Sequence, residues 1–179
     1  MPKNLSSYLA PLKEVLIFAA IILVFHFFFR AWANCWEYWP VKPYINLLHD
    51  MLSQLLFAQS VWVNEHILGL DFTTENRRML FENGYIGINY SCSGLKPMLQ
   101  YLVLMLAYPG PWKHKLWFVP AGLIIVHLTN IFRITGLSVV LINWPDYWDF
   151  SHDYIFRPFF YLVIFMMWVI WVEYFKKRS

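Results

Sequence analysis

The chain has 179 residues, of which 59% are apolar, 21% aromatic and only 14% charged, and its formal net charge is +3. Soluble domains are nearer half apolar and a quarter charged, so these figures exclude an ordinary soluble globule and a disordered chain. The low charge and the lack of a basic, aromatic-rich stripe exclude nucleic acid as a partner, and two cysteines make no disulfide framework. The composition therefore indicates an integral membrane protein whose surroundings are the lipid bilayer.

Four apolar stretches approach the roughly 20 residues that a helix needs to cross a bilayer core of about 30 Å. The first has no small-residue cleavage site, so we expect an uncleaved helix rather than a signal peptide. The second is short and is closed by a Pro-Gly-Pro turn. The expected spans cover residues 12–29, 93–109, 116–142 and 155–175.

Residues 44–63, between the first two spans, have the pattern of an amphipathic helix. An apolar stripe that includes Leu48 and Leu55 is backed by polar residues such as Asp50 and Gln59. This pattern favours a helix that lies at the membrane interface or packs within the bundle over a span that faces lipid. Whether it crosses the membrane is left open.

The positions of the lysines set the expected topology, because cytoplasmic loops carry an excess of Lys and Arg. Lysines cluster before the first span, between the second and third, and after the last. They share one side only if residues 44–63 do not cross, so we expect four crossings with both termini cytoplasmic. Arg30, Arg77 and Arg78 then lie outside, against the rule. The three clusters are Lys3 with Lys13, Lys113 with Lys115, and Lys176 with Lys177 and Arg178.

The most polar part of the chain, residues 70–91, contains a turn signal. Asn83-Gly84 between two β-prone runs is typical of a hairpin, so we expect a small extracytoplasmic β-hairpin that leads to Cys92. The predicted fold is thus an all-α integral membrane protein, with one membrane domain over residues 1–179. It has about four transmembrane helices, one amphipathic or additional membrane helix, and the hairpin.

Three reactive side chains fall on the outer side of the membrane in this topology. Cys92 stands at the start of the second span, Arg133 lies well inside the third, and His152 precedes the fourth. A cysteine at a helix N-terminus meets unpaired N–H groups that favour the thiolate, and Ser91 or Ser93 can cap such a helix. An arginine inside a span costs about 2.5–3.5 kcal/mol on insertion, so its default interpretation is functional.

Each of the three also has a structural interpretation. Cys92 is then a small buried side chain, Arg133 reaches the outer headgroups, and His152 is a solvated loop residue. Cys35, which lies among tryptophans, fits the structural interpretation better than Cys92 does.

Neighbouring polar residues are candidates for supporting roles. Asn130 lies one turn before Arg133 and can share its helix face as a hydrogen-bond partner. Asp153 can orient His152, with the two other aspartates of that loop as alternatives. The six histidines lack metal-ligand spacing, so we expect no metal and no cofactor.

A thiol, an imidazole and a guanidinium can together perform acyl transfer. The thiolate attacks a carbonyl, the guanidinium stabilises the oxyanion, and the imidazole protonates the leaving amine. These residues predict the chemistry without naming a substrate.

At these residues the chain resembles the exosortase/archaeosortase family of multi-pass membrane cysteine transpeptidases, in a short form of the Bacteroidetes type. The resemblance covers about residues 65–175. One position departs from the larger members of that family. They often have glycine four residues after the histidine, where this chain has Phe156. The matching elements are Cys92-Ser93-Gly94-Leu95, Asn130-Ile131-Phe132-Arg133 and His152.

The resemblance implies a thiol protease or transpeptidase, a hydrolase of peptide bonds, in the bacterial cytoplasmic (inner) membrane with its active site facing the extracytoplasmic side. Its partners would be membrane-anchored proteins whose C-terminal sorting signal is a motif, a transmembrane helix and a basic tail. Cys92 would form the thioester, Arg133 would orient the substrate or bind the oxyanion, and His152 would be the general acid and base. The motif and the acceptor (amine, lipid or water) are left open.

Two other classes compete with this interpretation. In a non-enzymatic membrane subunit, Arg133 would pair with an acidic partner helix and Cys92 would be structural or partner-binding. A small transporter is disfavoured because the spans lack paired acidic residues and broken-helix repeats.

Overall fold

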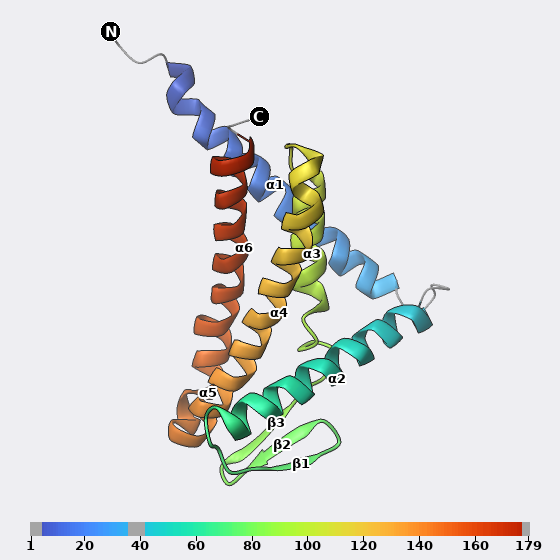
Figure 1. The fold of residues 1–179 in the computed structure, drawn as a ribbon, viewed down its shortest axis with the longest axis vertical. Coiled ribbons are helices and arrows are strands. Elements are labelled where there is room, and N and C mark those ends of the chain that lie inside the picture. Colours follow the sequence, from blue (N-terminus) through green and yellow to red (C-terminus); the bar gives the residue numbers. More distant parts are fainter. Residues whose placement is uncertain (1–4, 36–41, 177–179) are drawn as a thin grey trace.

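Long helices form a bundle with a small antiparallel sheet at one end (Figure 1), as seen in a computed structural model that describes residues 5–35 and 42–176. Between the helices α4 (Trp112–Asn143) and α6 (Arg157–Trp171) the chain makes three short turns. They are a 3-10 turn (Pro145–Tyr147), the short α5 (Trp148–Phe150) and a π-helical turn (Ser151–Phe156). A second π-helical turn (Val172–Lys176) extends α6. The long helices are α1 (Leu5–Cys35), α2 (Lys42–His66), α3 (Leu95–Ala107), α4 (Trp112–Asn143) and α6 (Arg157–Trp171).

Three helical segments of the described residues are long and apolar enough to cross a membrane: Leu12–Trp32, Trp112–Asn143 and Pro145–Lys176. They correspond to the first, third and fourth predicted spans. The second predicted span is represented by α3, whose 13 residues extend about 20 Å, less than a bilayer core. The multi-pass membrane architecture is confirmed, whereas the count of four crossings stays a prediction.

The polar side of α2 faces the bundle and its apolar side faces outward. Ser53, Ser60 and Asn64 are fully buried, and the Asn64 amide donates to the Ser138 hydroxyl of α4 at 2.8 Å. The bond to Ser138 gives the Asn64 amide nitrogen a partner that hydrocarbon could not provide. The exposed apolar residues are Tyr44, Leu47, Leu48, Met51, Leu55 and Trp62. The amphipathic pattern is therefore that of a bundle-packed helix with its apolar side outward.

Three antiparallel strands, not two, form the sheet: β1 (Thr73–Glu75), β2 (Arg78–Phe81) and β3 (Gly84–Gly87), in the order β1-β2-β3. The predicted Asn83-Gly84 turn joins β2 to β3, which confirms the hairpin. The extra strand β1 is joined through Asn76 and Arg77, whose φ angles of 43° and 62° are unusual outside glycine. An ion pair of 2.6 Å between Arg77 and Asp50 of α2 helps to hold this turn.

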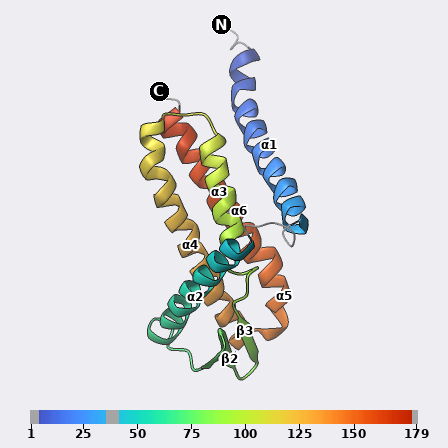
Figure 2. The ribbon, with the colours of Figure 1, turned by 90° about the vertical axis from the view of Figure 1, so that its right-hand side faces the viewer.

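Apolar side chains pack in two clusters along the bundle. The first joins α3, α4 and α6, and α1 packs against its outside, as Figure 2 shows. Tyr101, Leu104 and Trp171 are fully buried there. The second cluster joins α2 and the sheet to the C-terminal half of α4 through residues such as Leu56, Met79 and Leu137. The sheet is thus fixed to the bundle.

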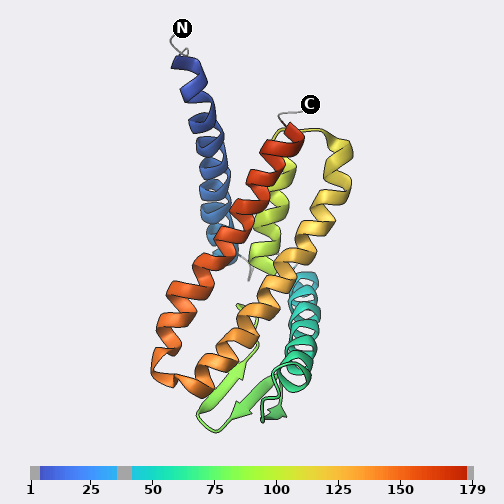
Figure 3. The same cartoon turned by 60° about the vertical axis from the view of Figure 1, so that its left-hand side comes forward.

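Both described ends of the chain and the α3–α4 turn lie at the end of the bundle opposite the sheet (Figure 3). Lys176 forms an ion pair of 2.6 Å with Glu14, which also accepts a hydrogen bond from the Tyr108 hydroxyl. Lys115 donates to the carbonyls of Leu106 and Tyr108. The lysine clusters therefore share one end; Lys3, Lys177 and Arg178 lie outside the described residues.

We predict that Gly122→Ala destabilises the bundle by about 1–3 kcal/mol through overpacking. A Cβ at Gly122 would lie 2.0 Å from the Tyr101 hydroxyl, which donates to the Phe118 carbonyl at 2.9 Å. Thermal unfolding in detergent measures the loss. Ile124→Ala, on the exposed side of the same helix, is the matched control and should change stability by less than about 0.5 kcal/mol. Equal stability of Gly122→Ala and wild type would contradict this packing.

Candidate active site

Cys92 lies in the loop between β3 and α3. Its backbone N–H donates to the Asn89 carbonyl and side-chain oxygens at 3.0 and 3.2 Å, and its carbonyl accepts from the Asn130 amide at 2.9 Å. The loop is thus tied both to its own turn and to α4. The side chain is partly exposed.

The N-terminus of α3 differs from the prediction. The helix begins at Leu95 and its N-cap is Gly94, not Ser91 or Ser93, so Cys92 precedes the first helical turn. The Ser93 hydroxyl still accepts from the N–H of Leu95 at 3.4 Å. The positive group in contact with the Cys92 sulfur is a side chain of α4 instead of the helix N-terminus.

The space beside Gly94 is too small for any side chain. Its φ of 82° is left-handed, and a Cβ there would lie 2.6 Å from the Asn130 amide nitrogen. Asn130 was expected to partner Arg133, but it donates to the Cys92 carbonyl instead. The close approach allowed by Gly94 is what lets Asn130 hold the cysteine loop.

Ser93 holds the same loop from the other side and brings in a residue that the sequence did not single out. It is fully buried, and its hydroxyl donates to the Tyr90 carbonyl at 2.9 Å. The Nδ1 atom of His49, from α2, lies 2.8 Å from this hydroxyl, and the His49 ring stacks on Tyr90. The signal for His49 is its place on the polar side of α2.

Arg133 joins the cysteine loop to the histidine turn. Its Nη2 atom lies 3.5 Å from the Cys92 sulfur and 3.4 Å from Nε2 of His152. The guanidinium also lies over the Phe160 ring, 5.9 Å from its centre, which is a favourable cation–π geometry. The structure therefore brings together the three reactive residues that the sequence singled out from separate segments.

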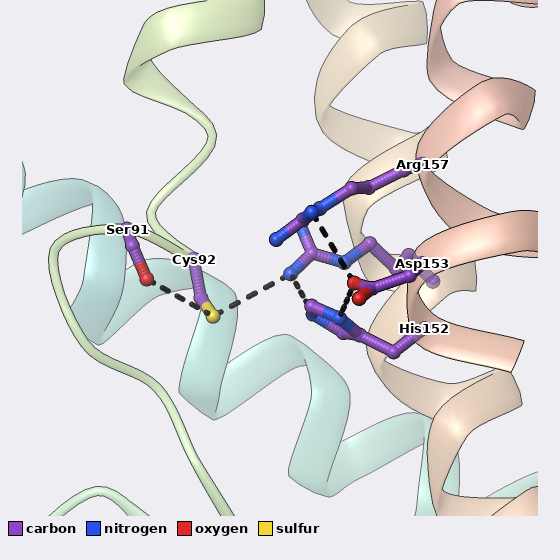
Figure 4. Close-up of polar contacts among 6 residues, drawn as sticks. Ser91, Cys92, His152, Asp153 and Arg157 are labelled. Carbon is purple, nitrogen blue, oxygen red and sulfur yellow. Dashed lines mark hydrogen bonds and ion pairs between the residues drawn. The ribbon is translucent and has the colours of Figure 1, made fainter. Parts of the chain in front are cut away.

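The contacts of His152 define its tautomer. Nδ1 lies 2.7 Å from a carboxylate oxygen of Asp153 (Figure 4). Nε2 faces the Arg133 guanidinium, which can only donate. In the neutral ring, Nδ1 therefore carries the proton and Nε2 presents its lone pair. Arg157, which the sequence did not indicate, pairs with Asp153 at 3.3 Å.

A π-helical turn carries His152 and is packed closely on α4. Phe156 of this turn is buried, and a Cβ on Gly136 of α4 would lie 2.5 Å from its ring. The Trp148 ring stacks on His152 at an interplanar angle of 14°. Phe156 thus helps to hold the turn that presents His152.

A pocket of about 400 Å³ opens onto Cys92, Arg133 and His152. Its floor is apolar and comes from α4, through Ile134, Leu137 and Leu141, while one wall is β3. Trp112 begins α4 at the end of the bundle where the lysines gather, here called the lysine end. Arg133 lies about 30 Å along α4 from Trp112. One bilayer thickness therefore separates the pocket from the lysines. Within the described residues, no three His, Cys, Asp or Glu side chains are grouped to hold a metal.

In a comparison with protein families, the model of the transmembrane exosortases matches residues 5–171. The match includes both the cysteine loop and the histidine turn. Comparisons with curated proteins and with solved structures find no match.

The contact between Gly94 and Asn130 predicts coupled substitutions. Gly94→Ala should cost about 1–3 kcal/mol, because its Cβ meets Asn130 and its φ is strained. In an Asn130→Ala background the clash is gone, so Gly94→Ala should cost less there. Thermal unfolding of the four proteins measures the coupling, and strictly additive losses would show that the two residues do not meet as described.

Proposed function

Because the chain belongs to the transmembrane exosortase family, we propose that it is a membrane cysteine transpeptidase or protease that cleaves the C-terminal sorting signals of surface-targeted proteins. One observation carries the proposal: a single guanidinium contacts both the Cys92 sulfur and His152 Nε2 inside one pocket. A thiol, an imidazole and a guanidinium can together perform acyl transfer through a thioester.

In the first half of the reaction, His152 Nε2 takes the proton of the Cys92 thiol. The thiolate attacks the scissile carbonyl carbon, a C–S bond forms, and the carbonyl electron pair moves onto oxygen. Arg133, next to the sulfur, stabilises this oxyanion. The C–N bond then breaks as the His152 imidazolium protonates the leaving amine, which departs with the membrane tail.

The second half of the reaction uses the same groups in reverse. His152 takes a proton from the incoming nucleophile, an amine or water, which attacks the thioester carbonyl and releases the Cys92 thiolate. Asp153 accepts a hydrogen bond from Nδ1 throughout, so it stabilises the imidazolium and fixes the ring. Arg157 holds Asp153 in turn, as a positioning residue.

The proposed topology places the pocket at the extracytoplasmic face of the bacterial cytoplasmic (inner) membrane. The lysine end lies one bilayer thickness away, in agreement with the excess of positive charge on the cytoplasmic side. A substrate anchored by its own transmembrane helix would leave the bilayer at the level of this pocket. A tail with a motif, a span and basic residues fits that geometry.

Cys92→Ala and Cys92→Ser should abolish processing of a tailed protein from the same organism. Arg133→Met should lower the rate by about 10²–10³-fold through loss of oxyanion stabilisation. His152→Ala should lower it by about 10²–10⁴-fold through loss of proton transfer. Immunoblotting of precursor and product measures the rates.

Two matched controls accompany these variants. Cys35→Ala should process normally, and Arg157→Met should lose only a few fold, because an exposed ion pair contributes about 0–1 kcal/mol. Normal processing by Cys92→Ala would overturn the mechanism and favour a non-enzymatic membrane subunit.

Topology can be tested separately from activity. In intact cells a membrane-impermeant maleimide should label Cys92, in a Cys35→Ala background, without permeabilisation, because the Cys92 side chain is partly exposed at the proposed outer face. Labelling only after permeabilisation would place the pocket on the cytoplasmic side.

A further inference from the structure

One wall of the pocket beside Cys92 is made by four consecutive residues, the whole of β3 from Gly84 to Gly87. Side chains alternate between the two faces of a strand. Four consecutive residues can therefore line the same pocket only if the backbone edge of the strand faces that pocket. In the strand order β1-β2-β3, no other strand of the described residues pairs with this edge of β3. The pocket is therefore bordered by an open sheet edge.

The pairing of β3 with β2 shows which backbone groups lie on that edge. Ile88 N–H donates to the Arg77 carbonyl at 3.1 Å, and Met79 pairs with Ile86 two residues further along. In antiparallel strands, residues that exchange hydrogen bonds alternate with residues that do not. Ile86 thus directs its N–H and carbonyl toward β2, whereas Tyr85 and Gly87 direct theirs toward the open edge.

Gly87 has no local reason to be glycine. Its φ is not left-handed, and a Cβ there would make only ordinary contacts, the nearest at 3.6 Å to Arg78. A glycine within a strand often marks a site where another backbone approaches closely. β3 also lacks the lysine or proline that commonly protects an exposed edge.

The opposite side of the pocket is the histidine turn, with Trp148 and His152, and Cys92 lies five residues after Gly87. A chain that follows the edge of β3 would therefore run through the pocket that Cys92 and His152 line. Arg133 reaches both of these groups. An extended peptide on this edge would present a carbonyl to the cysteine.

We propose that the substrate binds as an additional β-strand on the free edge of β3, through backbone hydrogen bonds to Tyr85 and Gly87. The inference rests on the proposed function, since it concerns the peptide which that function cleaves. Main-chain pairing gives affinity with little dependence on side chains. One enzyme could then hold many tailed proteins in the same register, with side-chain selection left to the pocket.

Gly87→Pro and Thr74→Pro form the test pair. At Gly87, proline removes the N–H at the open edge of β3 without removing a bond to β2. Thr74 of β1 pairs with Met79, which directs its own N–H and carbonyl toward β3, so proline at Thr74 removes an N–H at the opposite edge of the sheet, again without removing a bond to β2. Processing of a native tailed protein should fall by about fivefold to tenfold in Gly87→Pro, the value of one hydrogen bond, and by less than about twofold in Thr74→Pro. Alkylation of Cys92 by iodoacetamide, at the wild-type rate in both, shows that the site is intact.

Two results would overturn the strand proposal: wild-type processing by Gly87→Pro, or equal losses in both variants, which would indicate a general disturbance of the sheet. Cys92→Ala is run in parallel. Its normal processing would reject the proposed function itself, whereas an inactive Cys92→Ala beside a fully active Gly87→Pro rejects only the strand.

If iodoacetamide no longer alkylates Cys92 in Gly87→Pro, the strand proposal is tested by changing the substrate backbone instead. This experiment uses the wild-type protein in nanodiscs. The probes are synthetic peptides that copy the segment before the cleavage site of that tailed protein, with one amide at a time replaced by an ester. Pairing with β3 predicts that every second ester slows cleavage by about fivefold, because alternate N–H groups face the partner strand. A flat profile would overturn the proposal.

Discussion

The guanidinium of Arg133 is the group around which the site is arranged. A charged side chain within an apolar helix costs about 2.5–3.5 kcal/mol on insertion, and the surrounding structure must offset this cost. Here the Cys92 sulfur, His152 Nε2 and the Phe160 ring surround the charge. Because these partners come from three segments, one residue fixes the relative positions of the cysteine loop, the histidine turn and α6.

Close packing on α4 makes that convergence achievable. Gly94 lets the cysteine loop approach Asn130, and Gly136 lets the histidine turn approach through Phe156. Each glycine removes the side chain that would keep its neighbour at a distance. Helix α2 completes the scaffold by turning its polar side inward, where His49 reaches Ser93 in the cysteine loop. The apolar side of α2 is exposed and points away from the bundle.

The sequence predicted the helices from hydropathy and the β2–β3 turn from Asn-Gly. It also singled out, as reactive types near span boundaries, the three residues that the structure brings together. It missed β1, whose turn uses Asn76 and Arg77 in left-handed conformations without glycine. It also placed the start of α3 too early. The contacts of Asn130 and His49 could not be predicted, since they depend on how separate helices pack.

The proposed mechanism passes through a covalent acyl-enzyme intermediate, and direct detection of this intermediate is the sharpest test. The protein is incubated with a tailed substrate, stopped in acid and examined by intact-mass and peptide mass spectrometry. A thioester on Cys92 should carry the new C-terminus of the substrate and should be released by neutral hydroxylamine. Cleaved substrate that accumulates in a Cys92→Ala protein, or an acyl group that maps to another residue, would contradict the account.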